Sequence, residues 1–122
     1  MKNFDKMKES YLQENSSIRL GELATNLARI KSRSTNNHNH IVVKSIIEDS
    51  LYLIDWTVAD VNNEIAAQLG ELRSELAELQ HNLSTKWEDL AFRDDLIAVS
   101  TSWSERVLLS SGLLSESSLK AS

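Results

Sequence analysis

The chain contains no cysteine, no proline and only three glycines among its 122 residues. Without cysteine it can form no disulfide, and it has no thiolate to bind a metal ion or to act as a nucleophile. Sheets need many tight turns, which favour glycine, proline and Asn-Gly pairs, so the scarcity of these residues argues against a β-rich fold. Leucine, glutamate, alanine and serine are abundant instead, and this composition favours long helices joined by few loops.

Long hydrophobic runs and an excess of positive charge are also lacking. No uninterrupted apolar run exceeds four residues, as in Leu96–Val99, whereas a membrane-spanning helix needs about 20 apolar residues. The N-terminal segment MKNFDKMKES has no apolar region of the kind found in secretory signals. The net charge of −5, from 18 acidic and 13 basic side chains, opposes general binding to nucleic acids or anionic membranes, which is driven by cationic surfaces. We therefore expect a soluble, cytoplasmic protein with no membrane partner.

The length and composition indicate one domain. A chain of 122 residues with 41% hydrophobic and 25% charged side chains is long enough for one core and is typical of globular proteins. We expect a single helical domain over residues 1–112 and a flexible C-terminal tail over residues 113–122. Gly112 fits the left-handed position that ends many helices, and Leu113 would supply the hydrophobic contact of a Schellman motif.

Apolar residues recur every three or four positions along most of the chain, which is the spacing of one helix face. A first short stripe begins at Phe4, and the segment ENSS (14–17) interrupts it, where Ser16 or Ser17 would cap a new helix. The stripes that we expect in the core are Phe4, Met7 and Tyr11; Leu20, Leu23, Leu27 and Ile30; Val43, Ile47, Leu51, Ile54 and Val58; Ile65, Leu69, Leu72, Leu76, Leu79 and Leu83; and Phe92, Leu96, Val99, Trp103 and Val107.

Polar segments separate these stripes. SRSTNNHN (32–39) is typical of a loop, in which Asn37 or Asn39 would cap the helix that begins near His40. We predict a second break at residues 59–64, because an unbroken helix over residues 40–83 would be about 66 Å long, and its shorter neighbours would leave much of it uncovered.

The next helix ends are marked by further capping residues. Asp60 or Asn62 would cap the helix after the break. TKWE (85–88) fits a capping box for the last helix, in which Thr85 and Glu88 satisfy the first amides, and Asp89 is an alternative cap. The sequence thus predicts an all-α fold, an antiparallel four-helix bundle with an extra N-terminal helical segment.

Two histidines, His38 and His40, lie close together before an apolar helix. A structural zinc site needs four ligands and a catalytic one needs three plus water, and no third ligand follows at a recognisable spacing. We interpret the segment as a corner where a helix begins. His81 and Glu78 are one helical turn apart and could act as an acid–base pair, but such pairs more often form surface contacts. We therefore predict no catalytic, cofactor-binding or metal-binding residue, and no cofactor.

The one basic cluster is Arg29, Lys31 and Arg33. Phosphate contact is conceivable there, but cations in the last turn of a helix also suit its dipole. No aromatic side chain lies between them to stack on bases. Binding to nucleic acid is accordingly the weakest of our functional hypotheses.

The three tryptophans, Trp56, Trp87 and Trp103, are expected in the core. Trp87 lies next to a turn, and we expect it to be the least buried. The leucine stripe over residues 69–83 has a narrow seam with charged flanks, which resembles a short coiled-coil surface. It predicts either a core position or a homodimer interface, for which the candidate residues are Leu72, Leu76, Leu79, Leu83 and Trp87.

Two segments, LIDWTVAD (53–60) and WSERVLLSSGLL (103–114), are similar to segments of small, uncharacterised all-helical cyanobacterial proteins. The resemblance covers about a sixth of the chain and implies a cytoplasmic protein without an assigned activity. It identifies no functional residue in this sequence.

Our first functional hypothesis is a non-catalytic interaction or adaptor protein that acts through helix faces, either with a protein partner or as a homodimer. The alternative is a small helical enzyme or ligand-binding protein with a site between helices, where residues distant in sequence meet. The third hypothesis is the nucleic-acid-associated regulator that uses the basic cluster.

Overall fold

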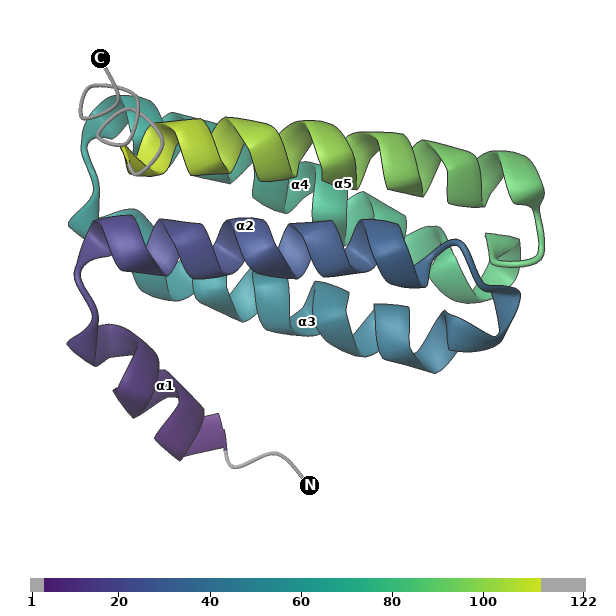
Figure 1. The fold of residues 1–122 in the computed structure, drawn as a ribbon, viewed down its shortest axis with the longest axis horizontal. Coiled ribbons are helices and arrows are strands. Elements are labelled where there is room, and N and C mark those ends of the chain that lie inside the picture. Colours follow the sequence, from purple (N-terminus) through teal and green to yellow (C-terminus); the bar gives the residue numbers. More distant parts are fainter. Residues whose placement is uncertain (1–3, 113–122) are drawn as a thin grey trace, which may run out of the picture.

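The computed structural model describes residues 4–112, and every regular element in that range is helical (Figure 1). None of these helices is long and apolar enough to cross a membrane. The elements in chain order are α1 (Phe4–Gln13), α2 (Ser16–Arg33), the 3-10 helix η1 (Asn37–Asn39), α3 (His40–Thr57), the 3-10 helix η2 (Val58–Asp60), α4 (Asn63–Lys86) and α5 (Leu90–Ser111).

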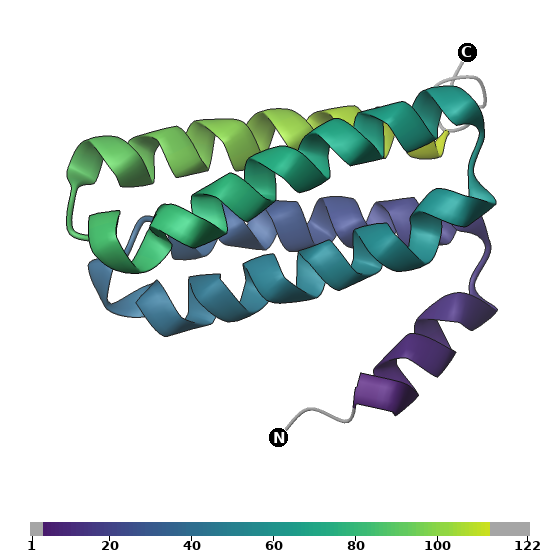
Figure 2. The same cartoon turned by 180° about the vertical axis from the view of Figure 1, so that it is seen from behind.

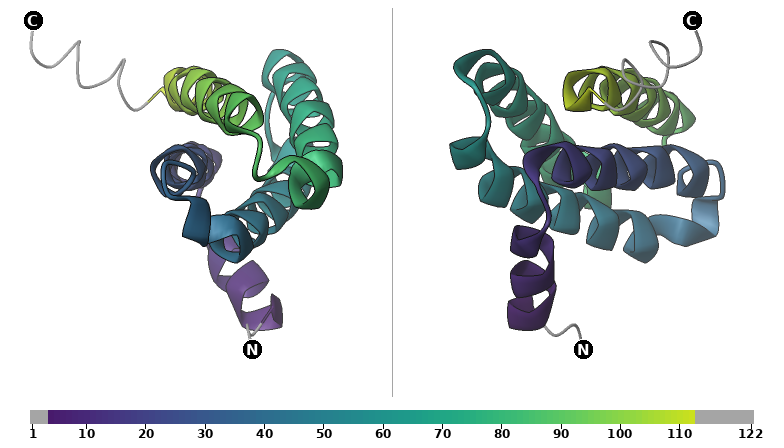
Figure 3. Two further views of the ribbon diagram at one scale, coloured as in Figure 1. Left: turned by 90° about the vertical axis from the view of Figure 1, so that its right-hand side faces the viewer. Right: turned by 60° about the vertical axis from the view of Figure 1, so that its left-hand side comes forward.

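The four longer helices form the predicted bundle, and each runs antiparallel to the next along the chain (Figures 1 and 2). The short helix α1 leaves one end of this bundle at a steep angle to α2 (Figure 3). The all-α fold with an additional N-terminal helix is therefore confirmed. The expected tail at residues 113–122 and the expected contact of Leu113 lie outside the described residues.

Within residues 4–112, asparagine and aspartate side chains cap the first turn of three of the α-helices. Asn15 Oδ1 accepts a hydrogen bond from the amide of Ile18 at 2.9 Å and so starts α2. Ser16 and Ser17, which we predicted as caps, lie inside that helix. The predicted break before α4 is confirmed, and Asn62 Oδ1 accepts from the amide of Ile65 at 2.9 Å.

The capping box predicted at residues 85–88 is wrong. Helix α4 continues to Lys86, and Thr85 Oγ1 donates to the carbonyl of Asn82 at 3.2 Å instead of capping a new helix. Asp89, the alternative, caps α5 by accepting from the amide of Ala91 at 2.9 Å. Ending α4 later brings Trp87 into the core, where only 2% of it is exposed. The burial of this large apolar side chain favours the longer helix.

The bundle is packed unevenly. Helices α2 and α5 have the most extensive contact, whereas α4 and α5 diverge (Figure 3). Small side chains permit the close approach, because Ala24 and Ser100 are buried along these two helices. Ser104 Oγ donates directly to the backbone carbonyl of Ala24 at 2.8 Å. A large residue at any of these positions would hold the two helices apart.

Gly112 ends α5 with φ = 80°, in the left-handed region that glycine adopts without a steric penalty. Its amide donates to the carbonyl of Leu109 at 3.2 Å. The role predicted for this glycine is confirmed.

Candidate functional site

The five residues predicted as a homodimer interface all lie inside the bundle. Their exposed fractions are 0% for Leu72 and Leu76, 9% for Leu79, 1% for Leu83 and 2% for Trp87. The other helices of the same chain already cover this stripe, so the interface assignment of these residues is corrected to a core assignment. A second copy could reach them only if the bundle opened.

The order of tryptophan burial also differs from our expectation. Trp87 and Trp103 are buried, with 2% and 3% exposed, whereas Trp56 is the partly exposed tryptophan. Trp87 is buried because the α2–α3 corner covers it. Its Nε1 donates to the carbonyl of Asn37 at 2.7 Å, and the imidazole of His40 stacks on it with ring centroids 5.3 Å apart.

The histidine segment is thus a packing corner that joins the loop before α3 to the end of α4. Arg93 lies near the same tryptophan, with its guanidinium carbon 5.7 Å from the ring centroid. His38 is exposed in η1. Over residues 4–112 no group of three or more histidine, cysteine, aspartate or glutamate side chains is placed to hold a metal ion.

The other charged residues singled out in the sequence remain separate. Glu78 and His81 are both exposed on α4. Lys31 and Arg33 are exposed in the last turn of α2. Arg29 points toward the middle of that helix, where it donates to Asn26 Oδ1 at 3.0 Å.

Two small hollows lie between the diverging helices α4 and α5, with volumes of about 280 and 240 Å³, and Glu75 and Val99 line both. Polar and cationic side chains occupy this groove. Trp103 Nε1 donates to Glu75 Oε2, and the guanidinium of Arg106 covers the Trp103 ring at 3.7 Å.

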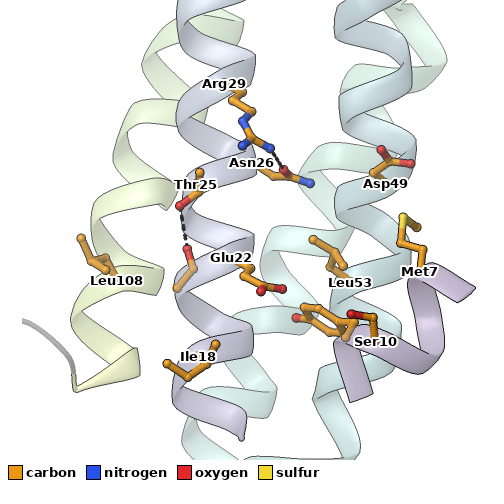
Figure 4. Close-up of a pocket in the computed structure, with 12 residues that line it drawn as sticks. Met7, Ser10, Ile18, Glu22, Thr25, Asn26, Arg29, Asp49, Leu53 and Leu108 are labelled. Carbon is orange, nitrogen blue, oxygen red and sulfur yellow. Dashed lines mark hydrogen bonds between the residues drawn. The ribbon is translucent and has the colours of Figure 1, made fainter. Parts of the chain in front are cut away.

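A larger hollow, of about 720 Å³, lies where α1 diverges from α2 over the surface of α3. We call it the α1–α2 cleft (Figure 4). The residues that line it are Met7, Ser10 and Tyr11 of α1; Ile18, Gly21, Glu22, Thr25, Asn26 and Arg29 of α2; Asp49 and Leu53 of α3; and Leu108 of α5. Apolar side chains from four helices thus line this hollow along the outer face of α2, with Leu108 on one side of that helix and Met7 and Leu53 on the other (Figure 4).

Tyr11 anchors α1 at the closed end of the cleft. Only 4% of it is exposed. Its hydroxyl donates to the carbonyl of Arg19 at 3.0 Å and lies 2.7 Å from Thr57 Oγ1. Thr57 Oγ1 also donates to the carbonyl of Leu53 at 2.7 Å. The hydroxyl groups of Tyr11 and Thr57 therefore link α1 to both α2 and α3.

The burial of this tyrosine changes its acidity. Removal from water raises the pKa of Tyr11 to about 12, because the phenolate would lose its hydration. The hydrogen bond with Thr57 acts in the opposite direction and is the smaller effect.

Arg19 fixes the linker at the base of the cleft, with 7% of the residue exposed. Its Nε donates to the carbonyl of Glu14 at 3.0 Å, and its Nη1 donates to the carbonyl of Trp56 at 3.0 Å and to Asp60 Oδ2 at 2.9 Å. One guanidinium therefore connects the α1–α2 linker to the end of α3 and to η2.

The outer end of α1 rests on an aromatic cluster. The ring of Phe4 meets those of Tyr52 and Trp56 edge-on, with centroid distances of 4.8 and 5.3 Å. Tyr11 lies on Trp56 from the other end of α1, at 5.9 Å. Aromatic contacts at both ends of α1 thus hold its angle to the bundle and keep the α1–α2 cleft open.

The sequence carried only a weak signal of this site. We placed Tyr11 on an apolar stripe, but nothing marked its hydroxyl as a link between helices. Arg19 stands four residues before Leu23, in register with the buried stripe of α2. An arginine in that register indicates a buried guanidinium that makes several hydrogen bonds.

The wall of the cleft carries uncompensated negative charge. Glu22 lies on α2 in the middle of the cleft, and partial burial raises its pKa, with a further rise from the charge of Glu14. Within residues 4–112 Glu22 has neither an ion pair nor a hydrogen bond through its side chain. The cleft therefore combines an apolar floor with a carboxylate, an arrangement suited to an apolar group that bears a cation.

Comparison with known proteins gave no match to a family model, a curated protein or a solved structure.

Proposed function

We propose that this chain is a non-catalytic protein-interaction module, and that the α1–α2 cleft receives the apolar face of a partner helix. The observation that carries the proposal is the apolar floor of this cleft, to which Met7, Tyr11, Ile18, Leu53 and Leu108 contribute. Amphipathic helices bind in such grooves through side chains at three- and four-residue spacing.

The shape of the cleft favours a helix as its occupant. Its α2 wall extends from Ile18 to Arg29, which corresponds to about 16 Å along the helix axis. A partner helix of three turns has the same length. Because the rim residues Glu22, Thr25 and Arg29 are exposed, an occupant would be covered on one face only, as a docked helix is.

Substitution of a rim residue by tryptophan tests the proposal. The side chain at position 25 lies over residue 21, because helical side chains lean toward the N-terminus. In Thr25→Trp the indole would fill the hollow above Gly21 while leaving the core intact. Ser74→Trp is the matched control, since Ser74 is exposed on α4 and does not line the cleft.

The measurement is co-purification of partners from the native host with wild-type chain and both variants as bait. We expect a helical partner that the wild type and Ser74→Trp retain and that Thr25→Trp loses. Equal recovery of every partner by both variants would contradict the proposal. A second copy of this chain is one such partner, and light scattering across a range of concentrations detects it.

A second candidate function is the binding of a small molecule in the same cleft. The volume of about 720 Å³ favours it, because ligand pockets typically have volumes of about 300–1,000 Å³. Native mass spectrometry of the chain purified from its host tests this function, since a bound ligand adds a discrete mass that Thr25→Trp would remove.

A further inference from the structure

We infer that the partner helix carries a lysine or arginine within its apolar face, and that this cation pairs with Glu22. The inference rests on the proposed function and specifies the chemistry of the partner. It follows from the position of Glu22 in the α1–α2 cleft and from the lack of an ion pair to its carboxylate within residues 4–112.

Glu22 lies midway along the α2 wall of the cleft, and Figure 4 shows its carboxylate directed toward α1 and α3, over the floor that an occupant would cover. A docked helix would therefore remove more of the water around it. An ionised carboxylate that loses water without gaining a partner strongly disfavours binding. A wholly apolar helix face would meet this penalty, whereas a lysine or arginine in that face would remove it.

The cations that flank Glu22 on α2 are engaged with other groups. Arg19, one turn before Glu22, pairs with Asp60 at 2.9 Å. Arg29 is the basic residue that lines the cleft, but it is seven positions further along α2, about 10 Å along the axis. Its guanidinium is turned toward Asn26, to which it donates at 3.0 Å (Figure 4). Both Glu14 and Glu22 remain without an ion pair inside residues 4–112.

The same charges select against other partners. Glu14 is close enough to Glu22 to act on it electrostatically, and neither carboxylate has an ion pair within residues 4–112. An acidic helix would bring like charges into a partly dehydrated groove, where their repulsion is stronger than in water. The cleft is therefore complementary to a basic amphipathic helix and not to an acidic one.

Three synthetic peptides test the inference. Each has 18 residues with leucine along one helical face and glutamine at the other positions, and one central position within the leucine face is lysine in the first peptide, glutamine in the second and glutamate in the third. Each peptide is titrated into the full-length, 15N-labelled chain, and the amide shifts of residues 18–29 and 49–53 report occupation of the cleft. The dissociation constant is obtained from the same titration.

We expect the lysine peptide to bind in the cleft at least about fivefold more tightly than the glutamine peptide, and the glutamate peptide to bind most weakly. Glu22→Gln should weaken the binding of the lysine peptide about five- to tenfold and leave that of the glutamine peptide as tight or tighter. Glu88→Gln is the matched control, because it removes the same charge in the α4–α5 turn at the far end of the bundle (Figure 1).

The results separate the two proposals. If the lysine and glutamine peptides both bind in the cleft with equal affinity, or if Glu88→Gln acts as strongly as Glu22→Gln, the inferred cation contact is wrong and helix binding stands. If no peptide shifts the cleft residues and Thr25→Trp retains every partner, the proposed function itself is wrong.

Discussion

Removal of the Tyr11 hydroxyl is the most direct test of how α1 is attached. Tyr11→Phe keeps the ring, and so keeps its contact with Trp56 at 5.9 Å. It removes the hydroxyl that links α1 to the carbonyl of Arg19 at 3.0 Å and to Thr57 at 2.7 Å. The change therefore isolates the polar link from the apolar packing.

The expected loss of stability follows from the groups that lose a partner. A buried hydrogen bond contributes about 0.5–1.5 kcal/mol, and a buried group left without a partner costs about 1–3 kcal/mol. Thr57 keeps its hydrogen bond to the carbonyl of Leu53, so the carbonyl of Arg19 is the main group affected. We expect Tyr11→Phe to lower the free energy of unfolding by about 1–3 kcal/mol. For a domain of this size that corresponds to about 4 °C in Tm per kcal/mol.

The difference in the free energy of unfolding between wild type and Tyr11→Phe should also depend on pH. A tyrosine in the unfolded chain titrates near pH 10, whereas burial raises the pKa of Tyr11 to about 12. Between these values the folded chain keeps a proton that the unfolded chain has lost. The stabilisation is therefore fully present below pH 10 and is lost as the pH rises toward 12. Its upper limit is about 2–3 kcal/mol, at about 1.4 kcal/mol per pKa unit.

Urea unfolding of wild type and Tyr11→Phe between pH 8 and 11.5 measures both effects. Lysine titration affects the two proteins equally and cancels in their difference. Tyr52→Phe is the control, because 44% of Tyr52 is exposed and a surface change there should stay within about 0.5 kcal/mol. The reasoning is refuted if Tyr11→Phe is as stable as wild type at pH 8, or if the difference does not shrink above pH 10.

Three further predictions concern other parts of the fold. Arg19→Met should lower the free energy of unfolding by about 2–4 kcal/mol, because two backbone carbonyls lose their donor. Asp60→Asn should lower it by less than about 1 kcal/mol, since the Asp60 side chain is 52% exposed. Equal losses for the two variants in urea unfolding would contradict this difference. Gly70→Ala should raise the free energy of unfolding by about 0.5–1 kcal/mol, and with it Tm, because an added Cβ meets nothing within 4 Å. Gly112→Ala should lower the free energy of unfolding by about 1 kcal/mol, because φ is 80° there. Ser104→Leu should lower stability by at least about 2 kcal/mol in calorimetry by separating α2 from α5, and an unchanged Tm would show that the contact with α2 is dispensable.

The periodic features of the fold were predictable from the sequence. Apolar spacing of three and four identified the faces of α2 to α5, because each face is buried against several neighbours and tolerates few polar residues. The break before α4 followed from the polar segment at residues 59–64 and from length, since a single helix over residues 40–83 would extend beyond its neighbours. Gly112 was recognisable because the left-handed conformation it adopts is costly for other residues.

Features that depend on contacts between residues distant in the sequence were not predictable. Thr85 and Glu88 match a capping box locally, but α4 continues past Thr85 to Lys86, and Trp87 is buried beneath the α2–α3 corner. Tyr11 is one more apolar position in the sequence, and its links to Thr57 and Arg19 exist only once three helices have met. The position of the α1–α2 cleft depends on those links and was missed for the same reason.

The contrast between the leucine stripe and the α1–α2 cleft explains which apolar surface the bundle leaves uncovered. In a four-helix bundle the regular apolar stripe of each helix points inward. The neighbouring helices therefore bury that stripe, as they bury Leu72 and Leu76. Helix α1 lies outside that arrangement and adds a second, smaller apolar layer over α2 and α3. Its apolar residues cannot all be covered by the bundle, because Tyr11 and the Phe4 cluster hold α1 at an angle to α2. The surface that we propose for a partner is therefore determined by α1, the helix that lies outside the four-helix arrangement.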